Sequence, residues 1–310
     1  MERTVKLIQG EERSGFYVQP LMKRVWAVQL DILNVIDTIC RRHDLKYYAW
    51  YGTLLGAVRH HGFIPWDDDM DLAMLREDYE KFKYFTETEL PEGWSVLKAD
   101  PTLIRILNTD VIRLDQEFLS RSHGCPFIIG VDIFCLDHIP PSKEDEEIWL
   151  NLFWAVCNLH THWNNFIEYS ELEKSRYEQL MEIENLTGYH FDRNSSISDQ
   201  LYELADKIAA MYWDTDSEEI AVISSLRRNN AYRIPRQSFD MILEVPFEDQ
   251  TIPVLDDYDF LLSLSYGKDY MIPRRYSLHS DIKEQMKDLQ KYFNDQGKEL
   301  PECFHMIFEE

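Results

Sequence analysis

The sequence has few cysteines, and their spacing argues against two common devices for stabilising a fold. Five cysteines occur among 310 residues, and no two of them form a Cys-X-X-Cys pair. An odd number without paired spacing disfavours a disulfide framework and a structural zinc site. We therefore expect reduced thiols within a hydrophobic core.

Long apolar runs are also lacking. No stretch approaches the roughly 18 consecutive apolar residues that indicate a membrane-spanning helix, and residues 1–6 contain no hydrophobic signal segment. These features predict a cytoplasmic protein without a transmembrane segment.

Basic residues are scarce relative to acidic ones. Lys and Arg together number 32 against 56 for Asp and Glu, which gives a net charge of −24. A chain of this charge repels nucleic acids and anionic bilayers, so we expect no nucleic-acid partner. Any phosphate ligand would need a cation or a local basic patch. The length and the 45% content of hydrophobic residues suffice for one large domain, with or without an appended lobe.

Hydrophobic periodicity predicts helices and short strands in the first part of the chain. Apolar residues near a 3.6-residue period predict a helix over residues 21–42. Further expected elements are strands over 47–51, 69–75, 94–99 and 127–137, helices over 54–59 and 76–90, and a hairpin of 103–107 with 111–115 around 108–110.

After Pro140 and Pro141 the sequence pattern changes to long helical stretches rich in Glu and aromatic residues. Later expected elements are long helical stretches over 144–184 and 198–213, short strands within 239–254, and a helix over 256–266 that ends at Gly267. The expected organisation is a catalytic core over 1–140, a helical lobe over 141–235, and a C-terminal segment over 236–310 that packs back on the core.

The most informative segment is Asp-Asp-Asp-Met-Asp at residues 67–71, which we call the acid motif. Four carboxylates in five residues repel one another, so a fold needs either full solvation or a bound cation to neutralise them. Apolar residues flank the motif, which argues against a solvated loop. Because alternate residues of a strand share one face, Asp69 and Asp71 should point the same way.

A further carboxylate, Asp132, lies within the apolar run 127–137. If that strand lies beside the acid motif, Asp132 joins Asp69 and Asp71 in an oxygen-only site. Such a site suits Mg²⁺ or Mn²⁺ and leaves positions open for phosphate oxygens and water. A structural role for Asp132, hydrogen-bonded to the backbone, is the alternative.

Gly52 and Thr53 precede a short helical segment and could form a phosphate-binding turn. Glycine lets the backbone approach a phosphate closely, and the following helical turn aims amide groups at it. Arg59 is a candidate phosphate ligand, although an arginine at a helix end also binds carbonyls or a carboxylate.

Together these residues indicate phosphoryl transfer, in which a metal bridges a diphosphate and a carboxylate helps to deprotonate an attacking hydroxyl. An Asp-X-Asp glycosyltransferase would also hold a nucleotide diphosphate through a metal, and a binding protein without turnover is a third possibility. A calcium loop is excluded by spacing, because Leu72 stands where a glycine must turn the chain.

Residues 51–71, Tyr-Gly-Thr-Leu-Leu-Gly-Ala-Val-Arg-His-His-Gly-Phe-Ile-Pro-Trp-Asp-Asp-Asp-Met-Asp, closely resemble the signature of the LicD family. This family includes bacterial phosphocholine transferases and is related to the fukutin proteins. Segments 130–134, 246–254 and 266–270 resemble it as well, so the likeness extends over residues 22–280. It implies an α+β fold with a nucleotidyltransferase-like mixed sheet, flanking helices and an additional helical lobe.

The resemblance also implies roles for individual residues. The expected correspondences are Gly52 and Thr53 with the phosphate loop, Asp69 and Asp71 with the paired metal acids, and Asp132 with the third carboxylate, as metal ligand or general base. Two positions depart from the family pattern, namely His61, where lysine is common, and Cys135, where proline is common.

The implied reaction moves an alcohol-phosphate, such as phosphocholine, from a CDP-activated donor such as CDP-choline to a hydroxyl of a cell-surface glycan. CMP is the leaving group, and Mg²⁺ or Mn²⁺ is the expected cofactor. Transfer of a nucleotide from a triphosphate stays open as an alternative, as does glycosyl transfer.

Overall fold

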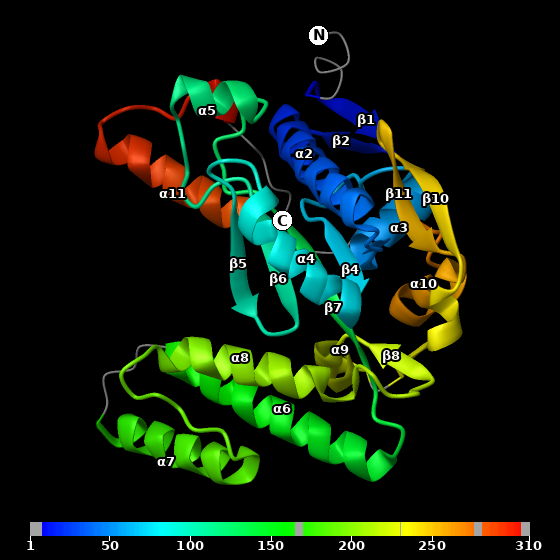
Figure 1. Cartoon of the computed structure of the whole chain (residues 1–310). Coiled ribbons are helices and arrows are strands. Elements are labelled where there is room, and N and C mark those ends of the chain that lie inside the picture. The colour runs from blue at the N-terminus through cyan, green and yellow to red at the C-terminus, as the bar shows by residue number, and fades with distance from the viewer. Residues whose placement is uncertain (1–7, 165–169, 230, 276–280, 305–310) are drawn as a thin grey trace. The chain divides into compact units, whose positions relative to one another are not determined.

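A computed structural model describes residues 8–164, 170–229, 231–275 and 281–304 (Figure 1). The chain divides into two compact units. The first unit comprises Met1–Leu97, Arg105–Phe134 and Met241–Glu310, and the second comprises Lys98–Ile104 and Cys135–Asp240. Helices and β-sheet occur together, which confirms the predicted α+β class.

The longest helix in the described part of the chain is α2, Pro20–His43, and it agrees with the predicted helix over 21–42. Pro20 opens the first turn, where a missing N–H costs no hydrogen bond. At the other end Asp44 adopts the left-handed conformation, with φ of 55°, and its amide donates to the carbonyl of Cys40. The buried face carries Val25, Trp26, Ile32 and Ile36, all at most 1% exposed.

The main sheet places the acid motif beside Asp132. Its order is β3-β4-β7-β6-β5, where the strands are Tyr48–Ala49, Asp71–Leu75, Gly130–His138, Leu103–Leu107 and Ser95–Asp100. β3 and β4 are antiparallel, with Tyr48 opposite Ala73. The amide of Asp132 donates to the carbonyl of Met70 at 2.9 Å, which fixes β7 against the end of the motif.

The predicted hairpin of 103–107 with 111–115 is wrong. β6 pairs instead with β5 and β7. Asn108 is not the turn of a hairpin: its buried side chain accepts from the amide of Ile129 at 2.8 Å and so extends the pairing with the segment before β7. Asp115 begins helix α5, Gln116–Arg121, by accepting from the amide of Phe118.

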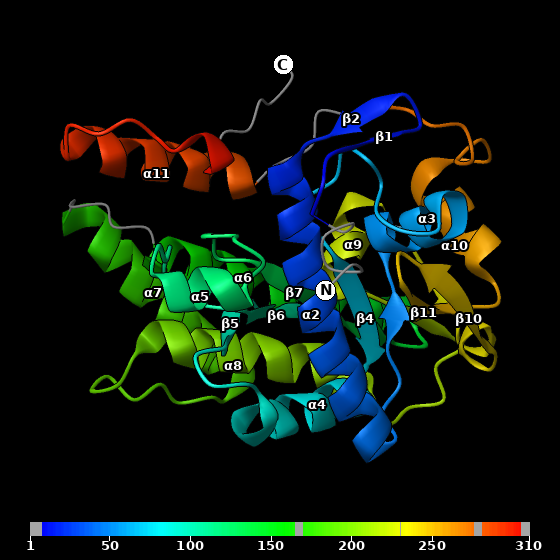
Figure 2. The same cartoon turned by 90° about the horizontal axis from the view of Figure 1, so that it is seen from above.

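In its described residues, four further helices, two hairpins and a short C-terminal turn complete the first unit. They are α3 (Tyr51–His60), α4 (Arg76–Glu89), α10 (Tyr258–Tyr266), α11 (Asp281–Asp295), β1–β2 (Glu11–Arg13 with Phe16–Val18), β10–β11 (Ile242–Phe247 with Gln250–Leu255) and η3 (Glu302–Phe304). α3 and α10 lie side by side (Figure 2), and β11 contacts β3. As predicted, Gly267 ends α10, with φ of 84°.

The second unit is mainly helical, and the stretch predicted to be helical over 144–184 overlaps two of its helices. Its elements are α6 (Lys143–Asn164), α7 (Ser170–Thr187), α8 (Ile197–Ala209), η1 (Ala210–Tyr212), β8 (Glu219–Ala221), α9 (Ile223–Arg228), β9 (Ile234–Pro235) and η2 (Arg236–Phe239). Trp149 anchors the unit's core, since its indole N–H donates to the carbonyl of Ile208 at 2.7 Å.

Four of the five cysteines, at 40, 125, 135 and 157, are buried and unlinked, while Cys303 is exposed. Within the described ranges, no helix has both the length and the apolar character that crossing a membrane requires.

Candidate functional site

The acid motif lies in an irregular segment that leads into β4. Sequence reasoning placed the strand at residues 69–75, whereas β4 begins at Asp71. Asp67 and Asp68 are 7% and 9% exposed, Asp71 is partly buried, and Asp69 is exposed. The motif is therefore not the solvated loop that an acidic run usually forms, because most of its carboxylates are withdrawn from water.

The backbone of the acid motif is held from several elements. On α2, the Trp26 indole N–H donates to the carbonyl of Asp67 at 2.9 Å, and the Gln29 amide donates to the carbonyl of Asp68 at 2.8 Å. The amide of Trp50, just before α3, donates to the carbonyl of Asp71 at 2.9 Å. These bonds fix the main chain of a segment that has no regular secondary structure until Asp71.

Burial and mutual repulsion disfavour ionisation of two motif carboxyls. The pKa of Asp67 is raised by burial first, then by the charge of Asp69, with which it also shares a side-chain hydrogen bond. The pKa of Asp71 is raised by burial and then by the charges of Asp69 and Asp132, while Arg105 opposes the rise. The carboxylates thus lie close enough for their charges to interact, and a cation placed among them would stabilise their ionised forms.

Asp132 and Arg105 form an ion pair across neighbouring strands β7 and β6. The Nη2 atom of Arg105 is 2.8 Å from Oδ2 of Asp132, and its Nε contacts Oδ1, so the pairing is bidentate. Gly130 permits this arrangement, because a Cβ there would lie 2.5 Å from Cδ of Arg105. Through this pairing Arg105, a basic residue of β6, lies beside the candidate acids.

Gly52 and Thr53 lie at the acids, within the first turn of α3 rather than in a turn before it. The Thr53 hydroxyl oxygen accepts a hydrogen bond from the amide of Asp71 at 2.8 Å, which joins the start of α3 to the start of β4. A Cβ at Gly52 would lie 2.8 Å from a carboxylate oxygen of Asp67. Tyr51 holds a left-handed conformation, with φ of 38°, which is costly for a non-glycine residue.

Arg59 lies in the last turn of α3, about 10 Å along the helix axis from Gly52. Its Nη1 donates to the carbonyl of Tyr270 at 2.7 Å, and its Nε donates to Nε2 of His60 at 2.9 Å. The geometry matches the carbonyl-binding alternative for this arginine. A phosphate contact of Arg59 stays a prediction.

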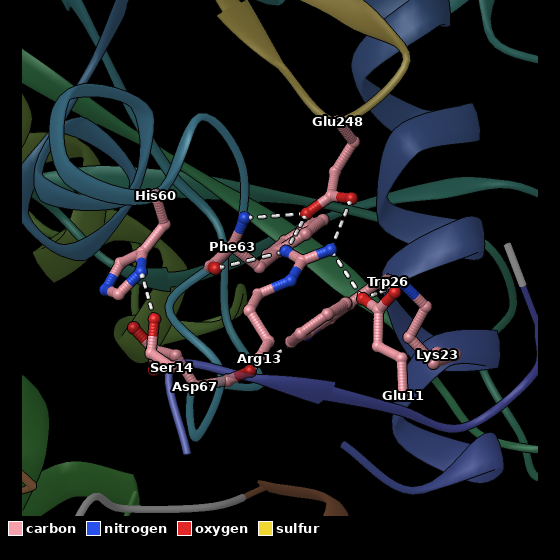
Figure 3. A network of polar contacts seen from close by, with 9 residues as sticks. All are labelled: Glu11, Arg13, Ser14, Lys23, Trp26, His60, Phe63, Asp67 and Glu248. Carbon is pink, nitrogen blue, oxygen red and sulfur yellow. Dashed lines mark hydrogen bonds and ion pairs between the residues drawn. The ribbon is translucent and has the colours of Figure 1, made fainter. Parts of the chain in front are cut away.

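A network around Glu248 holds the loop that precedes the acid motif (Figure 3). Glu248 occupies the β10–β11 turn with φ of 53°, and its carboxylate accepts from Arg13 at 2.5 and 3.0 Å and from the amide of Phe63 at 3.0 Å. Its own amide donates to the carbonyl of His61 at 2.8 Å. A Cβ at Gly62 would lie 2.1 Å from Oε1 of Glu248.

The Glu248 network continues to the first hairpin and α2. Arg13 also contacts Glu11 at 2.6 Å, and Lys23 contacts the same Glu11 oxygen at 2.8 Å. Arg13 and Lys23 lie over the ring of Trp26, which stacks on Phe63 with ring centroids 4.8 Å apart. Sequence reasoning grouped residues 246–254 with the family-like segments but named no role for Glu248. Its contacts cross between distant parts of the sequence, so spacing alone gave no signal.

A cavity of about 620 Å³ opens beside the acids in the first unit. Asp68, Asp69 and Asp132 border it, together with Arg105 and apolar side chains from β6 and the segment before β7. Gln285 of α11 holds the latter segment, since its side chain accepts from the amide of Ile128 and donates to the carbonyl of the same residue, both at 2.8 Å. The structure thus combines carboxylates and a hollow large enough for a small ligand.

The donor set suits a hard cation bound by few protein ligands. Among the described residues, no three His, Cys, Asp or Glu side chains are arranged to hold a metal ion together. Mg²⁺ often binds through one or two carboxylates and takes its other ligands from water and phosphate. Asp69 and Asp71 are our candidates for such a pair, because the charge of Asp69 disfavours ionisation of Asp71 and a cation would offset that effect. Asp132 as a third ligand stays a prediction, and its carboxylate contacts Arg105.

Comparison with known proteins gives matches around this site. Residues 44–163 match the family model described as LicD/FKTN/FKRP, nucleotidyltransferase domain. The lipopolysaccharide cholinephosphotransferase LicD of Haemophilus influenzae is 33% identical over 114 residues, which cover 36% of this chain and 43% of that protein. An uncharacterized protein of Rickettsia typhi is 50% identical over 42 residues, 14% of each chain. The chain spans less than half the length of these relatives.

Proposed function

Because the chain belongs to the LicD family, we propose that it is a phosphotransferase that moves an alcohol-phosphate from a CDP-activated donor to a hydroxyl of a cell-surface glycan. Phosphocholine is the first candidate for the transferred group, since the Haemophilus relative is a lipopolysaccharide cholinephosphotransferase. The observation that carries the proposal is the hydrogen bond from the Asp71 amide to Thr53, which brings the start of α3 to the acid motif.

In this proposal the acids bind the metal and the start of α3 binds the phosphate oxygens of the diphosphate. Asp69 and Asp71 would hold Mg²⁺ or Mn²⁺, which when bound neutralises charge on the diphosphate and on the departing CMP. The amides of Gly52 and Thr53, in the first turn of α3, have no acceptor within the helix and offer a positive dipole end to phosphate oxygens. This pairing compensates for the net charge of −24, which otherwise repels a phosphate ligand.

The transfer itself exchanges one P–O bond for another. The acceptor hydroxyl oxygen forms a bond to the phosphorus of the alcohol-phosphate, the bond from that phosphorus to the bridging oxygen breaks, and CMP leaves. The hydroxyl proton passes to a carboxylate. Asp132 is our candidate for this base if it does not bind the metal, because the bidentate contact with Arg105 fixes its orientation at the cavity wall.

The products distinguish this proposal from its rivals. Purified protein is incubated with Mg²⁺, lipopolysaccharide or another glycan acceptor, and CDP-choline, CDP-glycerol or CDP-ribitol. We expect CMP release and an acceptor heavier by the alcohol-phosphate in mass spectrometry. A nucleotidyltransferase would release pyrophosphate from a triphosphate, and a glycosyltransferase would leave a sugar without phosphate.

Binding without turnover is the remaining alternative. A ligand at one hundred times its dissociation constant stabilises the fold by about 2.7 kcal/mol, so thermal unfolding detects donor binding independently of transfer. Donor binding without CMP release from any acceptor tested would favour a binding protein. Absence of binding by every cytidine compound would count against the proposed function.

A further inference from the structure

A buried acceptor on α2 borders the cavity beside the acids. Gln29 is 1% exposed and lines that cavity. Its Nε2 donates to the carbonyl of Asp68 at 2.8 Å, which fixes the amide orientation, because a carbonyl oxygen can only accept. Its Oε1 is buried without a hydrogen-bond partner.

Gln29 Oε1 differs from other buried polar atoms without a partner because its residue lines the cavity. Of the buried side-chain atoms that lack a hydrogen-bond partner in the described part of the chain, it alone belongs to a residue lining this cavity. Buried polar atoms in native proteins are nearly always paired, and an exception calls for a missing partner. A residue of the cavity wall therefore carries an acceptor that lacks a donor.

The charge of the cavity restricts the kind of donor group. Its wall carries five carboxylates, from Asp68, Asp69, Asp110, Asp132 and Glu284, and one guanidinium, from Arg105. Arg105 is engaged by Asp132 in a bidentate contact. The remaining carboxylates repel anionic groups and attract cations and polarised N–H groups.

Apolar side chains form the rest of the wall. They are Met70, Leu97, Leu107, Ile128, Ile129 and Ile282. A ligand that fits therefore has a compact, largely apolar or planar body and presents an N–H group to Gln29.

We propose that Gln29 is a specificity-determining residue that accepts a hydrogen bond from an amino group of the donor substrate bound in this cavity. The inference rests on the proposed function and deepens it. A CDP-activated alcohol can present such a group from its cytosine base, through the exocyclic amine, or from an amino alcohol such as ethanolamine. A quaternary ammonium carries no N–H and cannot pair with Gln29.

Four small probes test the inference in the intact protein with Mg²⁺. Isothermal titration calorimetry compares CMP with UMP, which lacks the exocyclic amine, and phosphoethanolamine with phosphocholine, which lacks N–H. We expect the amine-bearing member of one pair, CMP or phosphoethanolamine, to bind about tenfold more tightly, the size expected for one hydrogen bond to a buried acceptor. Preference within the nucleotide pair identifies the base as the source, and preference within the other pair identifies the alcohol.

The variant Gln29→Met keeps the length of the side chain and removes the acceptor. We expect the tenfold preference to fall below about twofold in this variant. Asn34→Leu is the matched control, because Asn34 carries an exposed amide on the same helix, α2, and does not line the cavity. Its preference should match that of the unmodified protein.

Several outcomes would overturn the inference. They are equal binding within both pairs, no binding of any probe, and a preference that survives in Gln29→Met. The unmodified protein alone can give the first two results, so an unfolded variant does not remove the test. Since these titrations need no turnover, a preference without CMP release in the transfer assay would count against the proposed reaction but not against the role of Gln29.

Discussion

Removal of the Glu248 carboxylate should destabilise the first unit by about 2–3 kcal/mol. The variant Glu248→Ala leaves Arg13 with Glu11 as its acidic partner and deprives the Phe63 amide of its acceptor. Breaking a fully buried ion pair costs roughly 3–5 kcal/mol. Here Arg13 is 21% and Glu248 9% exposed, and Arg13 keeps one partner, so the cost should be smaller. Glu248→Gln keeps an acceptor and should cost only about 1 kcal/mol.

Urea unfolding followed by circular dichroism measures these costs, and hydrogen exchange at the Phe63 amide reports the local effect. Glu244→Gln is a suitable control, because this β10 residue is half exposed and lies 3.9 Å from Arg41. Its effect should stay within about 0.5 kcal/mol. A cost below about 0.5 kcal/mol for Glu248→Ala, or unchanged exchange at Phe63, would refute the view that Glu248 holds the loop before the acid motif.

Further predictions concern the same loop and the acids. The folded-state pKa values of Asp67 and Asp71 are raised above 3.8, so without metal the free energy of unfolding should fall as pH rises from about 4 through the raised values. Mg²⁺ should oppose that fall in thermal unfolding, and an identical pH profile with EDTA and with Mg²⁺ would contradict this. Gly62→Ala should cost about 1–3 kcal/mol in urea unfolding, because the new Cβ would lie 2.1 Å from Glu248, and a neutral effect would disprove the close contact. The pKa of His60 is lowered to about 4 by burial and then by the charges of Arg59 and Arg13, so its NMR signals should not titrate near pH 6.5.

Local sequence patterns predicted the regular elements well where one periodicity dominates. The helix predicted over 21–42 is α2, and the strand predicted over 127–137 overlaps β7, Gly130–His138. The hairpin after β6 was wrong because Asn108 has a long-range partner. Its side chain binds the backbone at Ile129, and such a bond leaves no mark on local turn signals.

The candidate site was predictable only where its residues lie close together in the sequence. The sequence identified the acids, Gly52 and Thr53 from a contiguous segment, and the structure brings Thr53 to Asp71. Glu248 could not be found in this way, because its bond to the Phe63 amide joins residues 185 positions apart. Gln29 could not be predicted either, because it lies on the buried face of α2. Hydrophobic periodicity indicates that such a residue is buried, but it does not show that its side-chain oxygen lacks a hydrogen-bond partner.

Manganese binding followed by electron paramagnetic resonance tests the central claim most directly, since the claim is that Asp69 and Asp71 hold a divalent cation beside the start of α3. The protein should bind Mn²⁺ in competition with Mg²⁺. Asp71→Asn should lose that binding and all transfer activity while keeping its fold, because it removes a ligand and relieves repulsion with Asp69 and Asp132. Mn²⁺ binding of equal affinity in Asp71→Asn and in the unmodified protein would contradict the account.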